Sequence, residues 1–172
     1  MVILIDTREQ RPLKFAAAIE TRVVTVPVGD YWTEYANGSR PPVFFERKSL
    51  ADLYGTMTSG YERFKREMQL AASNRWKLQI VCEVTLTDVR SGFDRSQFSG
   101  DSMIKKLMTL WVRHGLATTF CDGRAEAADF IEAAYESIER NWEPAAASGK
   151  QTRERKAALF GAAQLPLVTE YD

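Results

Sequence analysis

The chain has 172 residues, of which 45% are hydrophobic and 27% are charged. This composition is typical of an ordinary globular domain, and no apolar run reaches the ~20 residues of a membrane span. The 23 basic and 23 acidic residues cancel, so the net charge indicates no particular partner, although local basic patches are compatible with it.

Cysteine and histidine are scarce in this chain. Cys82 and Cys121 fit neither a disulfide framework nor a zinc site, which predicts reduced thiols in the core. The single histidine, His114, precedes Gly115 at an expected helix end, where a cation is favourable, so we exclude a Cys/His or Ser/His catalytic arrangement. The segment MVILIDTREQ has no secretory-signal pattern. We expect an intracellular protein, in the cytoplasm or nucleoid if it is prokaryotic or viral and in the nucleus if it is eukaryotic.

The first part of the chain is predicted to consist mainly of strands. β-Branched and alternating apolar residues predict strands over residues 1–6, 21–28, 30–36 and 43–48. KFAAAIE predicts a short helix over 14–20, and NGSRPP marks a turn. We therefore expect residues 21–48 to form an antiparallel meander.

The second part of the chain is predicted to contain most of the helices. Helical spacing of apolar residues predicts helices over 49–57, 61–73, 101–115 and 125–142, and strands are expected over 76–84 and 116–121. The order predicts one α/β domain over residues 1–142, with helices covering a mixed sheet. Residues 143–172 have linker-like composition and either form a short helix or remain disordered.

Charged residues gather at the end of the strand VFFERK. Residues two apart on a strand share a face, so Glu46 and Lys48 point one way and Arg47 points the other. The meander brings Asp30 within reach of Glu46, and Asp52 lies in the first turn of the next helix. Carboxylates beside an ammonium group suit hydrolysis of phosphodiesters with a hard divalent cation.

The string G-D-x(15)-E-R-K-x-x-x-D, which runs from Gly29 to Asp52, resembles the signature of the XPF-type structure-specific endonucleases. IDTREQ and TSGYERFKREM resemble the opening strand of that family and the helix after its ERK motif. The resemblance spans most of the predicted domain. It implies a restriction-endonuclease-like (PD-(D/E)xK) fold and a DNA endonuclease that uses Mg²⁺, or Mn²⁺ in its place, to cut branched duplexes at 3′ flaps or forks.

The resemblance also implies roles for individual residues. The expected catalytic residues, with Lys48 as the catalytic lysine, are Asp6, Glu9, Asp30, Glu46, Arg47, Lys48 and Asp52. The expected metal ligands among them are Asp6, Asp30, Glu46 and Asp52. Backbone N–H groups before the helix 61–73, and arginines near the site, predict DNA contacts at Arg8, Ser59, Gly60, Arg63 and Arg66.

Structural roles compete with several of these assignments. Asp52 completes a capping box with Ser49, Asp30 suits a turn, and Glu46 and Lys48 suit a salt bridge within the sheet. Asp6 is a plausible partner of Arg8. The arginines of the helix 61–73 also suit a solvated face on which Glu62 pairs with Arg66.

Two alternatives concern the protein as a whole. One is a catalytically silent subunit that binds branched DNA, and the other is a PD-(D/E)xK nuclease that works in restriction or DNA packaging. Members of the XPF-type family carry a helix-hairpin-helix module, and residues 143–172 show no hairpin motif of that kind. Either a partner subunit supplies this module, or the chain is a stand-alone nuclease with looser substrate choice. A homodimer is a further expectation. Candidate dimer contacts are the helix 102–114 and a face with Phe130, Ile131 and Tyr135.

Overall fold

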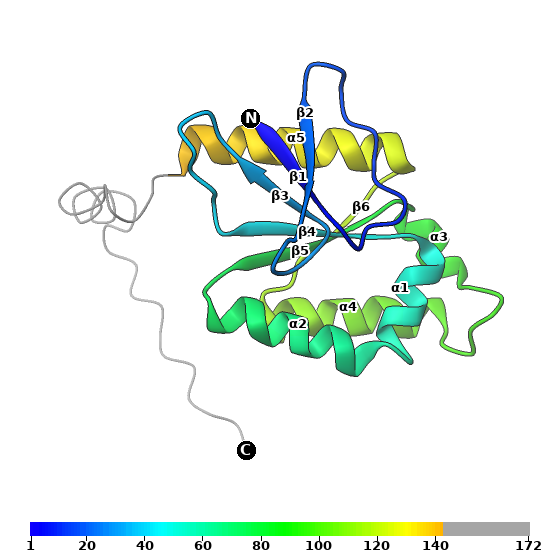
Figure 1. Cartoon of the computed structure of the whole chain (residues 1–172). Helices are drawn as coiled ribbons and strands as arrows, with labels where there is room; N and C mark the ends of the chain where they lie inside the picture. Colours follow the sequence, from blue (N-terminus) through cyan, green and yellow to red (C-terminus); the bar gives the residue numbers. More distant parts are fainter. Residues whose placement is uncertain (143–172) are drawn as a thin grey trace, which may run out of the picture. The chain divides into compact units, whose positions relative to one another are not determined.

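The structure is a computed structural model and describes residues 1–142 (Figure 1). The prediction for residues 143–172 lies outside the described residues. The strands are β1 (Val2–Asp6), β2 (Glu20–Val24), β3 (Tyr31–Glu34), β4 (Val43–Lys48), β5 (Lys77–Cys82) and β6 (Thr118–Phe120). The helices are α1 (Leu50–Met57), α2 (Tyr61–Ser73), α3 (Leu86–Ser91), α4 (Gly100–His114) and α5 (Arg124–Asn141). None of these helices is both long enough and apolar enough to cross a membrane.

The strands form one mixed sheet in the order β2-β1-β3-β4-β5-β6. β3 runs antiparallel to both of its neighbours, β1 and β4. β2 is parallel to β1, and β5 and β6 continue in the direction of β4. The predicted mixed α/β sheet is therefore confirmed, and its antiparallel part consists of β1, β3 and β4.

The position of β2 contradicts the expected meander over residues 21–48. β1 lies between β2 and β3, so β2 is an edge strand, and its Val23 side chain is 66% exposed. The strand ends at Val24 rather than at residue 28. Two features end the strand there: the Val26 N–H donates to the Asp6 carboxylate (2.7 Å), and Pro27 has no N–H to pair with another strand.

One helix prediction was also wrong, and one helix of the second part of the chain was missed. Residues 14–20 form no helix, because long-range partners hold this segment: the Leu13 N–H donates to the Tyr31 hydroxyl (2.9 Å) and the Ala16 N–H to Glu132 (2.6 Å). Helix α3 was not predicted, although its N-terminal capping box at Thr85 is visible in the sequence.

Helices cover both faces of the sheet, as Figure 1 shows. Phe44 of β4 packs in a core with α1, α2 and α4, whereas Phe45 packs in a second core with α5. Because successive side chains of β4 point to opposite faces of the sheet, this strand contributes to the hydrophobic core on each face. Ile131 and Tyr135 of α5 are fully buried in the second core, so the predicted dimer contact through that face is wrong.

The structural predictions for the two cysteines and the histidine hold. Cys82 and Cys121 are both buried and form no disulfide, and burial raises the pKa of the Cys82 thiol to about 12. His114 lies in the last turn of α4, which is closed by Gly115 in the left-handed conformation. The thiols are therefore inert core groups, and the histidine is a helix-end residue.

Candidate active site

The candidate site lies at one end of the central strands, where strands of opposite direction meet. β1 and β4 run in the same direction and β3 runs against both, so the ends of β1 and β4 lie beside the start of β3. Asp30 immediately precedes β3. Its N–H donates to the Phe45 carbonyl oxygen (2.8 Å), and its carbonyl oxygen accepts the Asp6 N–H (2.8 Å). Two strands therefore hold the Asp30 backbone from both sides.

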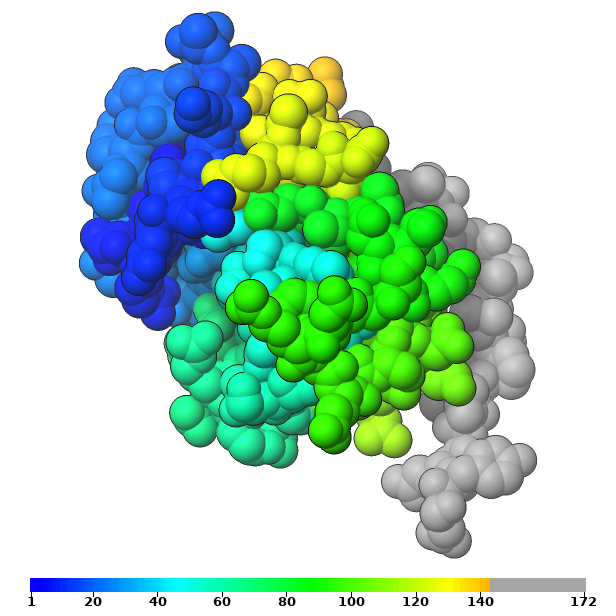
Figure 2. Space-filling model, turned by 90° about the vertical axis from the view of Figure 1, so that its right-hand side faces the viewer, coloured from blue at the N-terminus to red at the C-terminus, as the bar shows by residue number. Residues whose placement is uncertain are grey.

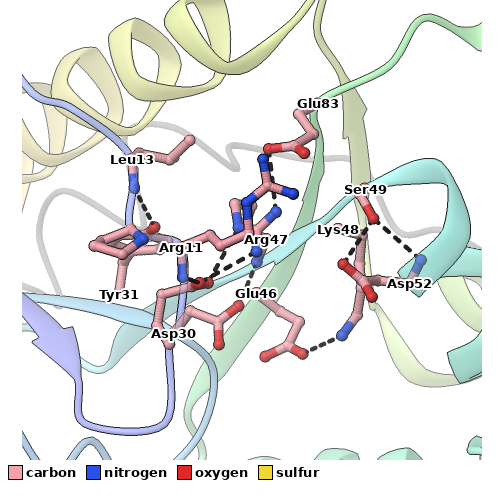
Figure 3. A network of polar contacts seen from close by, with 12 residues as sticks. Arg11, Leu13, Asp30, Tyr31, Glu46, Arg47, Lys48, Ser49, Asp52 and Glu83 are labelled. Carbon is pink, nitrogen blue, oxygen red and sulfur yellow. Dashed lines mark hydrogen bonds and ion pairs between the residues drawn. The ribbon is translucent and has the colours of Figure 1, made fainter.

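Glu46 and Lys48 share one face of β4, as predicted. Lys48 Nζ lies 2.5 Å from Glu46 Oε1, and each residue is only 7% exposed. Helix α2 covers this face, with the Phe64 ring centroid 5.8 Å from Lys48 Nζ. The Asp30 carboxylate accepts the Arg47 backbone N–H (2.8 Å) and lies beside Glu46 (Figure 3). Asp30, Glu46 and Lys48 are therefore close neighbours, and the salt bridge weighed as an alternative is present.

The pKa of each of these three groups is affected by one or both of the others. Burial and, to a smaller extent, the nearby Glu46 carboxylate together raise the pKa of Asp30 to about 8, against the opposing effects of Lys48 and the Arg47 N–H. Burial also raises the pKa of Glu46, opposed by Lys48. Burial alone would lower the pKa of Lys48, but the Glu46 and Asp30 carboxylates raise it above its ordinary value. One ammonium thus faces two carboxyl groups, an arrangement that a further cation would stabilise.

Arg47 points to the opposite face of β4 and holds a charged network. Its Nε lies 3.1 Å from Glu9 Oε2, and its Nη1 lies 3.1 Å from Glu83 Oε2. Arg124, at the start of α5, lies 2.8 Å from the same Glu83 oxygen and donates to the carbonyl oxygens of residues 11 and 12 (2.8 and 2.9 Å). Figure 3 shows the Arg47 side chain directed at Glu83. The network ties the loop after β1 to β4, β5 and α5.

The carboxylates of Asp6 and Asp52 have structural partners. Asp6 is 1% exposed and accepts from Arg8 Nε (2.6 Å) and from the Val26 N–H (2.7 Å). Burial would raise the pKa of Asp6, but these hydrogen bonds lower it below its ordinary value. Asp52 accepts from the Ser49 hydroxyl (2.7 Å), and its N–H donates back to that hydroxyl (3.2 Å). The Arg8 partner of Asp6 is thus present, whereas Asp52 contacts the Ser49 cap only through the hydroxyl and does not complete the capping box. Metal binding by Asp6 and Asp52 stays a prediction.

The segment before α2 corrects one expectation. The Gly60 N–H donates to the Gly55 carbonyl oxygen (2.8 Å), so the predicted free N–H at Gly60 is wrong, because the chain folds back on the end of α1. Arg63 and Arg66 are exposed, and within residues 1–142 neither forms an ion pair with Glu62. Contact of this segment with DNA stays a prediction.

A hollow of about 1080 Å³ joins these groups. Asp30, Glu46, Lys48 and Asp52 line it, together with Ser59 and Gly60 of the segment before α2. Its wall also includes five arginines: Arg8, Arg11, Arg47, Arg63 and Arg66. Figure 2 shows that the loop after β1 and helices α1 and α2 are exposed on one face of the molecule. An acidic pair with arginines around it suits a phosphodiester backbone.

Three charged residues of this region were not predicted. Glu67 lines the hollow from α2. It follows Arg63 by four residues, so helical spacing would have indicated it. Glu83 and Arg124 support Arg47, but no local pattern points to them. Their proximity follows from the pairing of β4 with β5, which joins distant parts of the sequence.

Comparison with known proteins identifies the family. The family model of the ERCC4 domain matches residues 5–134, a range that contains the whole of this candidate site. The chain belongs to the ERCC4 domain family. The resemblance to the XPF-type nuclease family is thereby confirmed. No curated protein matches the chain.

The solved structures that share the fold of this ERCC4 domain include two of XPF from Aeropyrum pernix. XPF from Aeropyrum pernix is 16% identical, with a TM-score of 0.53, and the match covers 93% of this chain and 72% of that chain. XPF from Aeropyrum pernix in complex with DNA is 17% identical, with a TM-score of 0.58, and the match covers 94% of this chain and 82% of that chain. The ERCC4 domain therefore has the restriction-endonuclease-like fold that the resemblance implied.

Proposed function

We propose that the chain is a metal-dependent DNA endonuclease that hydrolyses phosphodiester bonds in branched duplexes, at 3′ flaps or forks. One observation carries this proposal: the partly buried Asp30 and the buried Glu46 lie beside Lys48 in a hollow with arginines in its wall. Membership of the ERCC4 domain family supports it. The fold shared with an XPF solved in complex with DNA supports it as well.

The donor set of the hollow fits Mg²⁺, with Mn²⁺ as a substitute. Carboxylate oxygens are the ligands that Mg²⁺ prefers, and Mg²⁺ keeps water and phosphate oxygens in its other positions. Within residues 1–142 no three His, Cys, Asp or Glu side chains are grouped to hold a metal ion by themselves, so Asp30 and Glu46 would hold the ion as a pair. When bound, the ion supplies a water of lowered pKa and neutralises charge on the phosphate.

The side chains of the site divide the remaining tasks. Lys48 stays protonated because its pKa is raised, and its ammonium is available to orient water or to stabilise a phosphate oxygen. The Arg47 backbone N–H orients Asp30, and Lys48 orients Glu46. The exposed arginines of α2 are suited to bind backbone phosphates. Cleavage is expected to leave a 5′-phosphate and a 3′-hydroxyl.

Cleavage of end-labelled 3′-flap, splayed-fork and plain duplex DNA with Mg²⁺ tests this proposal. Wild type is compared with Asp30→Asn and Lys48→Ala, and with the control variants Asp129→Asn and Lys65→Ala, whose side chains are exposed and lie outside the hollow. We expect wild type and controls to cut the branched substrates, and both site variants to lose activity by about a hundredfold or more. A chelator should abolish cutting. Tight fork binding by wild type without cutting would instead establish a DNA-binding subunit.

We also propose that α4 provides the contact with a second copy or a partner subunit. Met108, Trp111 and Val112 on this helix are 43%, 56% and 74% exposed, and their spacing places them on one side of it. Large exposed apolar side chains in a group mark interaction surfaces. Sedimentation equilibrium of wild type and Val112→Asp tests the homodimer. If wild type is a dimer and Val112→Asp is a monomer, the homodimer contact through α4 is supported. If wild type is a monomer, a partner subunit is the remaining occupant of this surface.

A further inference from the structure

Glu67 of α2 binds the turn that carries Asp30. Its Oε1 accepts the Gly29 N–H at 2.7 Å. The side chain is partly buried and lines the hollow together with Asp30, Glu46 and Lys48. A helix on one side of the hollow is therefore bonded directly to the residue before a proposed metal ligand.

The Gly29–Asp30 turn has an unusual backbone that needs such support. Gly29 has a φ of +70°, and a Cβ added there would lie 2.8 Å from the Phe45 carbonyl oxygen. The turn thus passes so close to β4 that only glycine fits. Asp30 N–H and C=O bind Phe45 and Asp6, and the Glu67 carboxylate binds the N–H one residue earlier. The turn is anchored to β4, β1 and α2.

The hydrogen bond between Gly29 and Glu67 opposes a repulsion within the site. The Asp30 and Glu46 carboxyl groups are close neighbours, and when both are ionised their repulsion favours movement of the Asp30 turn away from β4. A hydrogen bond from the Gly29 N–H to a side-chain oxygen on α2 resists that movement, whether the acceptor belongs to a carboxylate or to an amide. The bond from Gly29 to Glu67 therefore restrains the turn.

We propose that Glu67 is a positioning residue: its hydrogen bond to Gly29 fixes the Asp30 carboxylate beside Glu46. This inference rests on the proposed function, because its consequence is a well-formed ligand pair for the metal ion. The role requires an acceptor oxygen and not a negative charge. Glutamine keeps that oxygen at position 67, whereas alanine removes it.

Metal affinity tests the proposal without cleavage. Mn²⁺ binding to the DNA-free protein is measured by electron paramagnetic resonance for wild type, Glu67→Gln, Glu67→Ala and the control Glu62→Ala, which alters an exposed residue of the same helix outside the hollow. We expect Glu67→Ala to weaken Mn²⁺ binding by about tenfold, with Glu67→Gln and Glu62→Ala unchanged. Unchanged binding in Glu67→Ala, or equal loss in Glu67→Gln, would overturn the proposal.

Kinetics on a flap substrate add a second readout. Glu67→Ala should lower kcat by about tenfold or more while KM for DNA stays within about twofold, and Glu67→Gln should restore kcat. A raised KM with unchanged kcat would show that Glu67 serves DNA binding and would overturn the positioning role. If wild type binds Mn²⁺ as expected but cuts no DNA, the proposed function fails while the affinity data still decide the role of Glu67.

Amide hydrogen exchange covers the case in which Glu67→Ala does not fold. The Gly29 N–H is followed by NMR in wild type and in Glu67→Gln, both without metal. Protection in both proteins supports the hydrogen bond. Exchange of the wild-type Gly29 N–H at the rate of an unprotected amide would overturn the proposal.

Discussion

At the scale of single residues, the charged groups of the site are held in fixed positions at a cost to the stability of the folded protein. Asp30 and Glu46 are carboxyl groups placed where burial raises the pKa of each. Among the described residues, Lys48 is the one ammonium that forms an ion pair with Glu46. Groups that oppose folding in this way persist where function requires them, so the free energy of unfolding should respond when one of them is removed.

Asp30→Asn is expected to stabilise the metal-free protein at about pH 8. The pKa of Asp30 rises from 3.8 to about 8 on folding. Between these values the folded protein binds a proton that the unfolded chain does not, so the free energy of unfolding falls as pH rises. Asparagine does not titrate. The advantage of the variant should therefore grow from about pH 5 to about pH 8, by an amount on the order of 1–3 kcal/mol.

Urea unfolding in the presence of a chelator measures this difference at each pH. Asp129→Asn is the control, because Asp129 is exposed on α5. A difference between Asp30→Asn and wild type that does not change with pH would contradict the raised pKa.

Gly29→Ala is expected to destabilise the protein by about 1–3 kcal/mol, because the left-handed backbone and the close Phe45 carbonyl oxygen both oppose a Cβ. Gly55→Ala is the matched control. A Cβ at Gly55 meets nothing within 4 Å in α1, and alanine there should stabilise by about 0.5–1 kcal/mol. Chemical denaturation of both variants measures these changes in the free energy of unfolding. Equal stability of Gly29→Ala and wild type would mean that the turn has room to move.

At the scale of secondary-structure elements, charged side chains hold the site together across the sheet. The network that runs from Glu9 through Arg47 and Glu83 to Arg124 joins the loop after β1 to three further elements. Its members other than Arg124 are largely buried, so the cost of leaving one charge unpaired is large. The loop itself contributes Arg8 and Arg11 to the hollow.

Arg124→Ala is expected to loosen the loop of residues 7–13. The variant loses hydrogen bonds to the carbonyl oxygens of residues 11 and 12 and the ion pair with Glu83. We expect a loss of stability of about 1–2 kcal/mol, and faster hydrogen–deuterium exchange in peptides that cover the loop. Arg140→Ala, an exposed change at the other end of α5, is the control. Equal exchange in both variants would show that the loop does not depend on Arg124.

At the scale of the whole molecule, a net charge of zero conceals an uneven distribution. Five arginines line the hollow, and two of them, Arg63 and Arg66, lie exposed on α2. Electrostatic attraction to a phosphate backbone depends on such local charge rather than on the sum. DNA affinity should therefore depend strongly on salt despite the neutral chain.

The double variant Arg63→Ala/Arg66→Ala is expected to weaken duplex binding and to reduce the slope of log affinity against log salt by about 2, since each lost phosphate contact accounts for about 0.9. Fluorescence anisotropy with a chelator present measures it. The control is Arg95→Ala/Arg113→Ala, which removes the same charge from exposed positions outside the hollow. If the control lowers the slope equally, DNA does not bind through α2.

The sequence by itself determined the class of the fold and the centre of the site. Alternation in VFFERK predicted that Glu46 and Lys48 share a face, and the spacing from Gly29 to Asp52 identified the family. These features are local, because the alternation of a strand and the spacing of a motif depend on residues that lie near one another in the sequence.

Only the tertiary structure decided how those parts are joined. It placed β1 between β2 and β3, kept residues 14–20 out of a helix, and brought Glu67 to Gly29 and Arg124 to Glu83. Each of these outcomes depends on hydrogen bonds and packing between residues far apart in the chain. Local propensity carries no information about which distant partner a group will meet, and so these contacts could not be predicted from the sequence pattern.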